Sequence, residues 1–218
     1  MTIVTSSFDA LECKSTAIPM KRKTRQIPEA LNRPLYPLTE VAAYARVPTS
    51  TVRALVNPRG LIVPAASGPA TLSFANLVEV FVLAAIRRQH RVSMPKVRLA
   101  VRYVSAQLGV ERPLIHQVFR TDGVDLFVDR LGQIENASRS GQLALKAAMN
   151  SRLERVEWSN GIAARIFPFS RADEGTDPRL IISPTFGFGQ PVMAGTGVRV
   201  SVIRDRFKAG EATQELAA

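Results

Sequence analysis

Residues 74–90, FANLVEVFVLAAIRRQH, form a strongly apolar stretch that ends in basic residues. Ser73 stands directly before it, where a serine hydroxyl accepts a hydrogen bond from a free N–H group of the first helical turn. The sequence therefore predicts an apolar helix that is capped by Ser73.

A second long helix is predicted over residues 94–108, MPKVRLAVRYVSAQL. Ser93 is its expected N-cap, Pro95 lies in its first turn and Gly109 ends it. One face is apolar and consists of Val97, Val101, Val104 and Leu108. The basic residues lie elsewhere on the helix and are Lys96, Arg98 and Arg102.

Two shorter helices are predicted before these. In LTEVAAYARV the apolar residues Leu38, Val41, Ala42 and Ala45 recur at helical spacing. Thr39 is a plausible N-cap, and Pro48 ends this helix. TSTVRALV follows, with Thr49 or Ser50 as its cap. Two short helices joined by about three residues are typical of a helix-turn-helix.

A small β-hairpin, or wing, is predicted between these two pairs of helices. GLIVPAASGPATLS, residues 60–73, contains two β-prone runs on either side of Ser67-Gly68-Pro69.

This order resembles the DNA-binding region of MerR-type regulators over residues 36–105. VPTSTVRAL, RGLIVP and LSFANLVEVFVLAAIRRQHRVSMPKVR match the family's helix, pre-wing and paired-helix patterns. The resemblance implies that Arg53 contacts phosphate and that Ser50 and Thr51 face the major groove, with Lys96 and Arg98 as further DNA-binding residues. The chain departs from the family at Ala54-Leu55, which replaces an aromatic pair, and its wing has no arginine or tyrosine.

Positive charge is concentrated in the first half of the chain, whose overall net charge is +11. Residues 20–120 contain sixteen Lys/Arg and four acidic residues, whereas residues 121–218 contain twelve of each. A basic block beside a neutral one indicates that the first part meets a polyanion. A basic surface that only confers solubility is the alternative.

Residues 1–34 are predicted to be a disordered basic arm, because their periodicity is weak and their charges cluster over residues 21–25. Cys13 is the single cysteine and excludes an internal disulfide, so a reducing cytoplasm is expected. No signal peptide and no membrane-spanning apolar run is found.

After residue 110 the pattern changes to that of a small α+β module, residues 111–169. β-prone runs over residues 115–138 predict a β-meander, a helix is predicted at 141–154, and Asn160-Gly161 predicts a hairpin turn. His116, Asp122, Asp125 and Asp129 do not suggest catalysis, because the aspartates fall largely in predicted turns. Residues 170–178 form a polar linker.

The last region begins with TFGFGQPVMAGTGVRVSVI, residues 185–203. Its glycines do not form a phosphate loop, since residues 183–207 hold no lysine and the third glycine of a dinucleotide fingerprint is missing. They are explained better by turns between short strands, with Pro191 restricting pairing. We therefore expect no nucleotide and no cofactor.

The same region resembles the C-terminus of VapB-type antitoxins, which pair with PIN-like toxins. The family pattern is close to P-x-I-x-F-G-x-P-V-I-x-G-T-R/G-I-x-V-x-x-I, followed by a helix and A/S-G-E. Residues 179–218 match it at Gly187, Gly189, Pro191, Gly195, Thr196, Gly197, Gly210 and Glu211. The family usually continues through further helices, so the unit is expected to be truncated.

The resemblance implies a toxin partner that is a Mg²⁺-dependent ribonuclease, whose acidic site is blocked by a cation of the antitoxin. The candidate toxin-binding residues are Arg165, Arg171, Arg199, Arg204 and Arg206. The sequence does not rank them.

The sequence as a whole predicts an α+β multi-domain antitoxin that binds operator DNA as a homodimer and represses its own transcription. The predicted divisions are the arm (1–34), the winged helix-turn-helix (35–110), the module (111–169), the linker (170–178) and the antitoxin region (179–218). The alternative is a MerR-like regulator whose middle module senses a small ligand. An enzyme is not expected, because two histidines and one cysteine provide no catalytic or metal-binding set.

Overall fold

The computed structural model describes residues 27–56, 61–68, 72–89, 92–169 and 180–216. The fold is mixed α+β, 60% helical, with small two-stranded antiparallel sheets. The elements before residue 110 are α1 (Glu29–Asn32), β1 (Pro34–Tyr36), α2 (Leu38–Ala45), α3 (Thr49–Leu55), β2 (Leu72–Ser73), α4 (Phe74–Gln89) and α5 (Met94–Leu108). Those after it are η1 (Pro113–Ile115), η2 (Phe119–Gly123), α6 (Val124–Glu135), α7 (Arg139–Leu153), β3 (Val156–Ser159), β4 (Ile162–Ile166), β5 (Leu180–Ile181), η3 (Gly187–Gly189), β6 (Val192–Met193), α8 (Val200–Lys208) and α9 (Thr213–Leu216).

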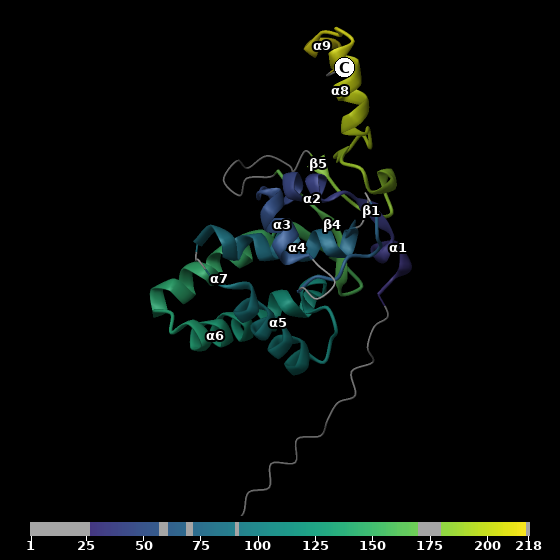
Figure 1. The fold of residues 1–218 in the computed structure, drawn as a ribbon. Coiled ribbons are helices and arrows are strands. Elements are labelled where there is room, and N and C mark those ends of the chain that lie inside the picture. Colours follow the sequence, from purple (N-terminus) through teal and green to yellow (C-terminus); the bar gives the residue numbers. More distant parts are fainter. Residues whose placement is uncertain (1–26, 57–60, 69–71, 90–91, 170–179, 217–218) are drawn as a thin grey trace, which may run out of the picture.

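Helix α4 is the centre of the molecule (Figure 1). Every residue from Phe74 to Ile86 is buried, and α4 packs against α7, α2, α1 and η1. A helix that is hydrophobic on all sides is stable only when other elements surround it. The predicted cap is confirmed, because the backbone N–H of Asn76 donates to the Ser73 hydroxyl at 3.2 Å.

Helices α2 and α3 confirm the predicted pair of short helices, but their capping residues differ from the prediction. Each helix begins directly after a proline, Pro37 or Pro48, and neither proline provides a side-chain cap. Thr39, Thr49 and Ser50 therefore lie inside the helices. Helix α2 ends at Arg46, whose left-handed conformation (φ 56°) turns the chain.

The predicted wing hairpin does not form between the described parts of its two runs. Ile62 instead forms a bridge with Val56, and its N–H donates to the Leu55 carbonyl at 3.1 Å. Leu72 pairs with Tyr36 of β1. Each run therefore pairs with an element that comes before the predicted turn.

The predicted β-meander is wrong, because residues 119–135 are helical. Val124, Phe127, Val128 and Leu131 of α6 are all buried, and their spacing places them on one face of the helix. Their β-branched and aromatic character suggested strands, but helical periodicity decided the structure. Helix α7 and the β3–β4 hairpin around Asn160-Gly161 are confirmed.

One hydrophobic cluster extends from Leu31 to Ile182. It includes residues of both predicted units, 35–110 and 111–169. The two units therefore share one core, and whether they fold separately stays a prediction. The predicted disordered arm, residues 1–34, extends too far toward the C-terminus, because α1 is helical and its residue Leu31 is buried. The rest of the arm and the linker at 170–178 lie outside the described residues.

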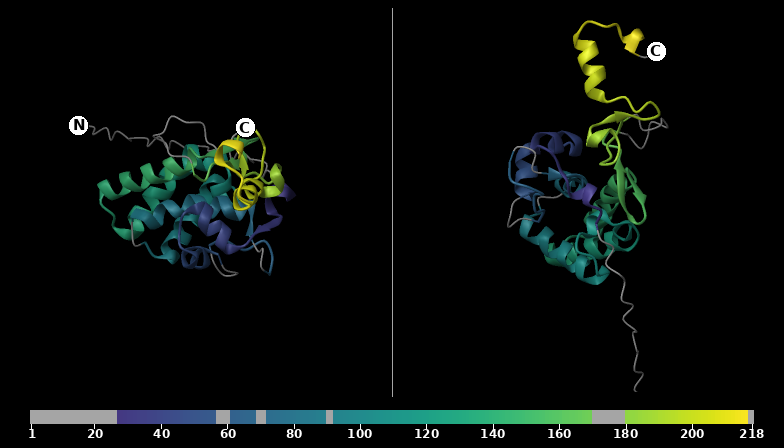
Figure 2. Two further views of the ribbon diagram at one scale, coloured as in Figure 1. Left: turned by 90° about the horizontal axis from the view of Figure 1, so that it is seen from above. Right: turned by 90° about the vertical axis from the view of Figure 1, so that its right-hand side faces the viewer.

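The C-terminal region has a docked part and a projecting part. Ile182 pairs with Ile166 of β4 through two N–H···O bonds of 3.0 Å, and β5 pairs with β6. Helices α8 and α9 then extend away from the body of the molecule (Figures 1 and 2). Among the described helices, none is long and apolar enough to cross a membrane.

Candidate DNA-binding face and partner-binding segment

Arg152 attaches the α2–α3 unit to α7 and α4. Arg152 of α7 is only 5% exposed and donates to the carbonyl of Ala45, at the last turn of α2, at 3.2 Å. Its guanidinium lies 4.8 Å from the centroid of the Phe81 ring on α4. A cation is favourable at a helix C-terminus and over an aromatic face, so Arg152 connects α7, α4 and α2.

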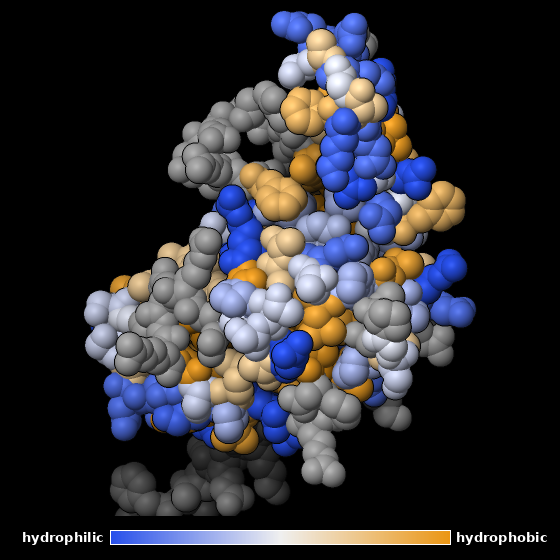
Figure 3. Space-filling view, turned by 45° about the horizontal axis from the view of Figure 1, so that its top comes forward, coloured by the Kyte–Doolittle hydropathy of each residue, from blue (hydrophilic) through white to orange (hydrophobic). Residues whose placement is uncertain are grey.

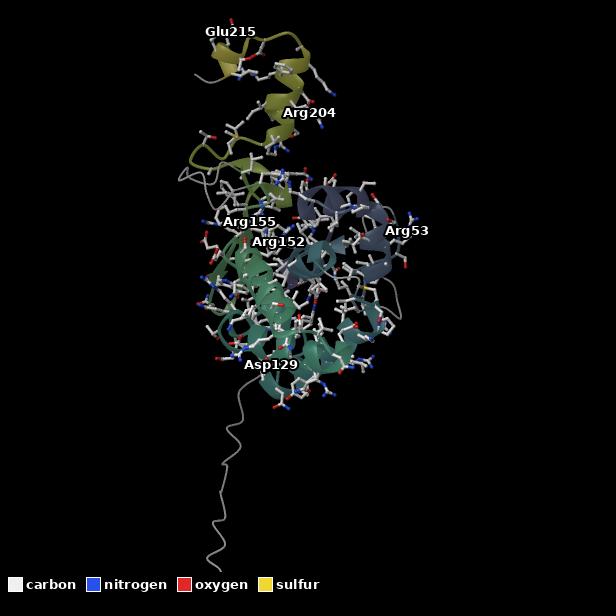
Figure 4. The ribbon with its side chains drawn as sticks, turned by 90° about the vertical axis from the view of Figure 1, so that its left-hand side faces the viewer. Arg53, Asp129, Arg152, Arg155, Arg204 and Glu215 are labelled. Carbon is white, nitrogen blue, oxygen red and sulfur yellow. The ribbon has the colours of Figure 1, made fainter. Side chains whose placement is uncertain are left out.

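Ser50 and Arg53 of α3 are exposed, and Arg53 lies at the periphery of the molecule (Figure 4). Thr51 is 4% exposed and packs inward between α3 and the core. Its prediction as a groove-facing residue is therefore corrected. Successive helical residues point about 100° apart, so Ser50 and Thr51 do not share a face.

The two predicted DNA-binding residues of α5 lie away from α3, with α4 between the two helices (Figure 1). The Lys96 ammonium forms an ion pair with Glu135 of α6 at 2.9 Å. Arg98 is half-buried, and its Nε has no hydrogen-bond partner among the described residues. Helix α3 and helix α5 therefore do not form one cluster of cations.

The docked part of the C-terminal region is held by Tyr36. The Tyr36 hydroxyl donates to the Gly189 carbonyl at 2.8 Å, across 153 positions of sequence. Burial raises the pKa of Tyr36 well above its usual range, and the neighbouring Tyr44 and Glu40 raise it further. Tyr36 therefore stays protonated as a donor. Sequence analysis missed this contact, because nothing in the local pattern of either segment indicates its distant partner.

The glycine-rich region contains tight turns, as predicted. Gly187, Gly189, Gly195 and Gly197 all have positive φ, between 61° and 83°. Phe188 is left-handed as well (φ 56°) and 84% exposed. A bulky residue in this conformation is strained, and such strain persists only where the surroundings impose it.

Helix α8 has no buried residue. Val202 and Phe207 are exposed on it beside Arg199, Arg204 and Arg206. Figure 3 shows hydrophilic and hydrophobic side chains mixed on this segment at the top of the molecule. Arg206 pairs with Glu211, whose hydrogen bond and charge raise the pKa of the guanidinium.

Arg165 lies apart from this helix on β4, where it is half-exposed and pairs with Glu157 at 3.4 Å. Arg171 lies outside the described residues. Three of the five predicted toxin-binding arginines therefore lie at α8: Arg199 is its N-cap, and Arg204 and Arg206 belong to the helix. No group of three or more potential metal ligands occurs in the described parts of the chain.

In the described part of the chain, α3 therefore presents one exposed face, and α8 is a separate helix with no buried residue. No protein-family model matches the chain. A curated protein of Mycobacterium tuberculosis (strain ATCC 25618 / H37Rv), "Putative antitoxin VapB45", is 27% identical in an alignment 212 positions long that covers 84% of this chain and 87% of the relative. The relative is named as an antitoxin and not as an enzyme, in agreement with the prediction that this chain is not an enzyme.

A crystal structure, that of Rv2018 from Mycobacterium tuberculosis, is similar with a TM-score of 0.68 at 24% identity. The similarity covers 85% of this chain and 91% of the other. At this identity it establishes the fold alone, and the fold extends over most of both chains.

Proposed function

We propose that the protein is an antitoxin that binds a protein toxin through its C-terminal segment and binds operator DNA through the α2–α3 unit. The similarity to a protein named as an antitoxin supports the first part of this proposal. The VapB-type pattern of residues 179–218 makes a PIN-like ribonuclease the proposed toxin, and a homodimer that represses its own operator is the proposed DNA-binding form.

One observation carries the proposal: exposed apolar side chains are concentrated in the C-terminal segment. Ten large hydrophobic residues are exposed among the described residues, and five of them lie between residues 186 and 207. The five are Phe186, Phe188, Val198, Val202 and Phe207. Exposed apolar side chains concentrated in one segment offer a partner apolar surface to bury, and aromatic residues are frequent anchors of interfaces.

The positive charge of α8 indicates that the partner surface is negatively charged. Residues 199–208 carry four Lys/Arg against the single acid Asp205. A projecting helix with apolar and basic side chains fits a groove that is apolar and lined with carboxylates. The active site of a Mg²⁺-dependent ribonuclease has that character, because Mg²⁺ is bound through carboxylates.

Co-expression of the full chain with the toxin gene beside it tests the proposal. The chain should co-purify with the toxin, and a variant that stops after residue 198 should not. The matched control is Arg53→Ala, which alters only the proposed DNA face and should retain the toxin. Toxin binding by the shortened chain at undiminished affinity would refute the assignment of the C-terminal segment.

The second candidate function, sensing of a small ligand by the middle module, is favoured by a cavity of about 240 Å³. It lies against α6 and α7 and is lined by Val92, Val128, Leu131, Glu135, Gln142 and Leu145, among others. Operator binding that responds to a small molecule without any toxin would support this function instead.

A further inference from the structure

A second cavity lies beside the segment that follows α3. Its volume is about 530 Å³, within the range of roughly 300–1,000 Å³ that is usual for small-ligand sites. It is bordered by residues 61–65, by α1, α4 and α5, and by η1 with the two residues before it. None of the predicted DNA-binding or toxin-binding residues lines it.

Its polar wall contains a partly buried ion pair, in which Glu79 is buried and the Arg112 side chain is 24% exposed. Glu79, 6% exposed, lies on α4, where Asn76 is the only other polar residue between Phe74 and Ile86. Arg112 donates to its two carboxylate oxygens from Nε at 2.8 Å and from Nη2 at 2.6 Å. Burial alone would lower the pKa of Arg112, but its hydrogen bonds to Glu79 and the charge of that carboxylate outweigh burial and raise it. The Arg112 guanidinium therefore stays charged beside Glu79.

Glu111 is exposed and adds a second carboxylate to the polar wall, whereas Asn76 and part of Arg112 have partners within the protein. Asn76 Nδ2 donates to the Val63 carbonyl at 3.0 Å, and its Oδ1 accepts from Ser73. Arg112 Nη1 donates to Asn32 Oδ1 at 2.9 Å. A guanidinium has five N–H donors. Among the described residues only three of those of Arg112 are engaged, so two remain for another acceptor.

The rest of the wall is mostly apolar. Leu61, Ile62, Pro64, Val101, Pro113 and Leu114 line the cavity beside the ion pair. A buried ion pair seldom adds stability over apolar residues of similar volume, because both charges lose their hydration. The Glu79–Arg112 pair instead borders a cavity, and two N–H groups of Arg112 have no partner among the described residues. This position indicates that the pair recognises a ligand.

We propose that this cavity binds a small amphipathic molecule. Its carboxylate or carboxamide oxygen accepts hydrogen bonds from the two free N–H groups of Arg112, and its short apolar chain packs against Leu61, Ile62 and Leu114. The planar donor set of arginine suits such oxygen acceptors. An ammonium group offers only donors and has no acceptor for Arg112.

The site is connected to the proposed DNA-binding helix. Ile62, in its wall, bonds to Leu55 of α3, and Val63 bonds to Asn76 of α4. A ligand in the cavity therefore contacts the segment that joins these two helices. The binding itself does not depend on the proposed antitoxin function and is tested without toxin or DNA.

Three six-carbon probes test the site on the full chain by calorimetry and by amide chemical shifts. Hexanoate and hexanamide should bind in the millimolar range and shift residues 61–65 and Arg112. Hexylamine should bind at least about tenfold more weakly, because it cannot accept from Arg112. Equal binding of the three probes would overturn the proposed recognition by Arg112, and no binding of the first two would overturn the site.

A matched pair of variants locates the binding. Ala65 is exposed and lines the cavity, whereas its neighbour Ala66 does not line it. Ala65→Phe should weaken hexanoate by about tenfold or more, since the added ring occupies the cavity, whereas Ala66→Phe should change it little. If Ala65→Phe binds as the unchanged chain does, the probe lies elsewhere. Should either variant unfold, the chemical shifts of the unchanged chain decide the question alone.

Discussion

Helices α4 and α8 are opposite extremes within one chain. Every residue of α4 from Phe74 to Ile86 is buried, whereas in α8 no residue is buried. Helix α4 is surrounded by α1, α2, α7 and η1, while the main helical neighbour of α8 is the short α9 (Figure 2). Most of the stability of a protein helix comes from packing. Helix α4 obtains that packing from its own chain, and α8 has room to obtain it from a partner.

The Tyr36–Gly189 hydrogen bond marks the boundary between the packed part of the chain and the exposed C-terminal part. Before it, residues 180–189 are bonded to β4 and β1. After it, β6 still pairs with β5, and from Val200 onward the chain leaves the body. The C-terminal region is thus anchored at one end and exposed at the other, which suits a segment that presents a binding helix on a stable base.

The largest expected effect is on stability and comes from the buried helix. Phe81→Ala should lower the free energy of unfolding by about 3–5 kcal/mol, because the ring is fully buried and packs against Arg152 and Arg155. Phe207→Ala is the control on α8, where the ring is 61% exposed, and should cost no more than about 0.5 kcal/mol. Urea denaturation measures both. Similar losses would mean that α8 packs against the body.

The second prediction concerns the anchor. A Cβ at Gly189 would lie 2.8 Å from both Leu35 Cδ1 and Tyr36 Oη, and its φ of +79° disfavours side chains. Gly189→Ala should therefore lower the free energy of unfolding by about 1–3 kcal/mol. Gly195→Ala is the control, since its φ is +83° but nothing lies within 4 Å of its Cβ. The contrast fails if Gly195→Ala costs as much as Gly189→Ala.

The third prediction is a dependence on alkaline pH. Burial, then the nearby Glu40, raises the pKa of Tyr44, and burial raises that of Tyr36. Above about pH 10 the unfolded chain loses these protons while the folded chain keeps them, so stability decreases by up to about 1.4 kcal/mol per pH unit for each group. Tyr44→Phe should reduce this slope in denaturation between pH 9 and 11. An unchanged slope would exclude Tyr44 as a source.

The sequence predicted the elements whose signals are local. The Ser73 cap, the Gly109 stop and the Asn160-Gly161 turn each depend on a few adjacent residues, and all three are confirmed. The segment around α6 was mistaken for strands, because Val124, Phe127 and Val128 favour strands by type while their spacing is helical. Residue type is weaker than periodicity when the two disagree.

The sequence identified exposed side chains of the candidate binding sites, but not the contacts that join distant parts of the chain. Arg199, Arg204 and Arg206 were unranked candidates, and all three are exposed, with Arg199 directly before α8 and the other two on it. The contacts of Arg152 with Ala45 and of Glu79 with Arg112 cross 107 and 33 positions. Charged residues are rarely buried unless they are paired, and a sequence does not name the pair.

The last prediction concerns α3, which has a buried face and an exposed face and so lies between α4 and α8 in character. Arg53 is exposed, so Arg53→Ala should change stability by no more than about 0.5 kcal/mol. If Arg53 contacts phosphate, the same variant should weaken operator and random duplex DNA by similar factors and lower the salt slope of binding by about one. Arg102→Ala is the matched control, because Arg102 is an exposed arginine of α5 and not of α3. Loss of operator binding alone would show that Arg53 contacts bases, since phosphate contacts carry no sequence information. Equal losses of DNA affinity in the two variants would mean that DNA contacts the basic surface as a whole and not α3 in particular. The exposure of a helix would then not suffice to identify a binding face in this chain.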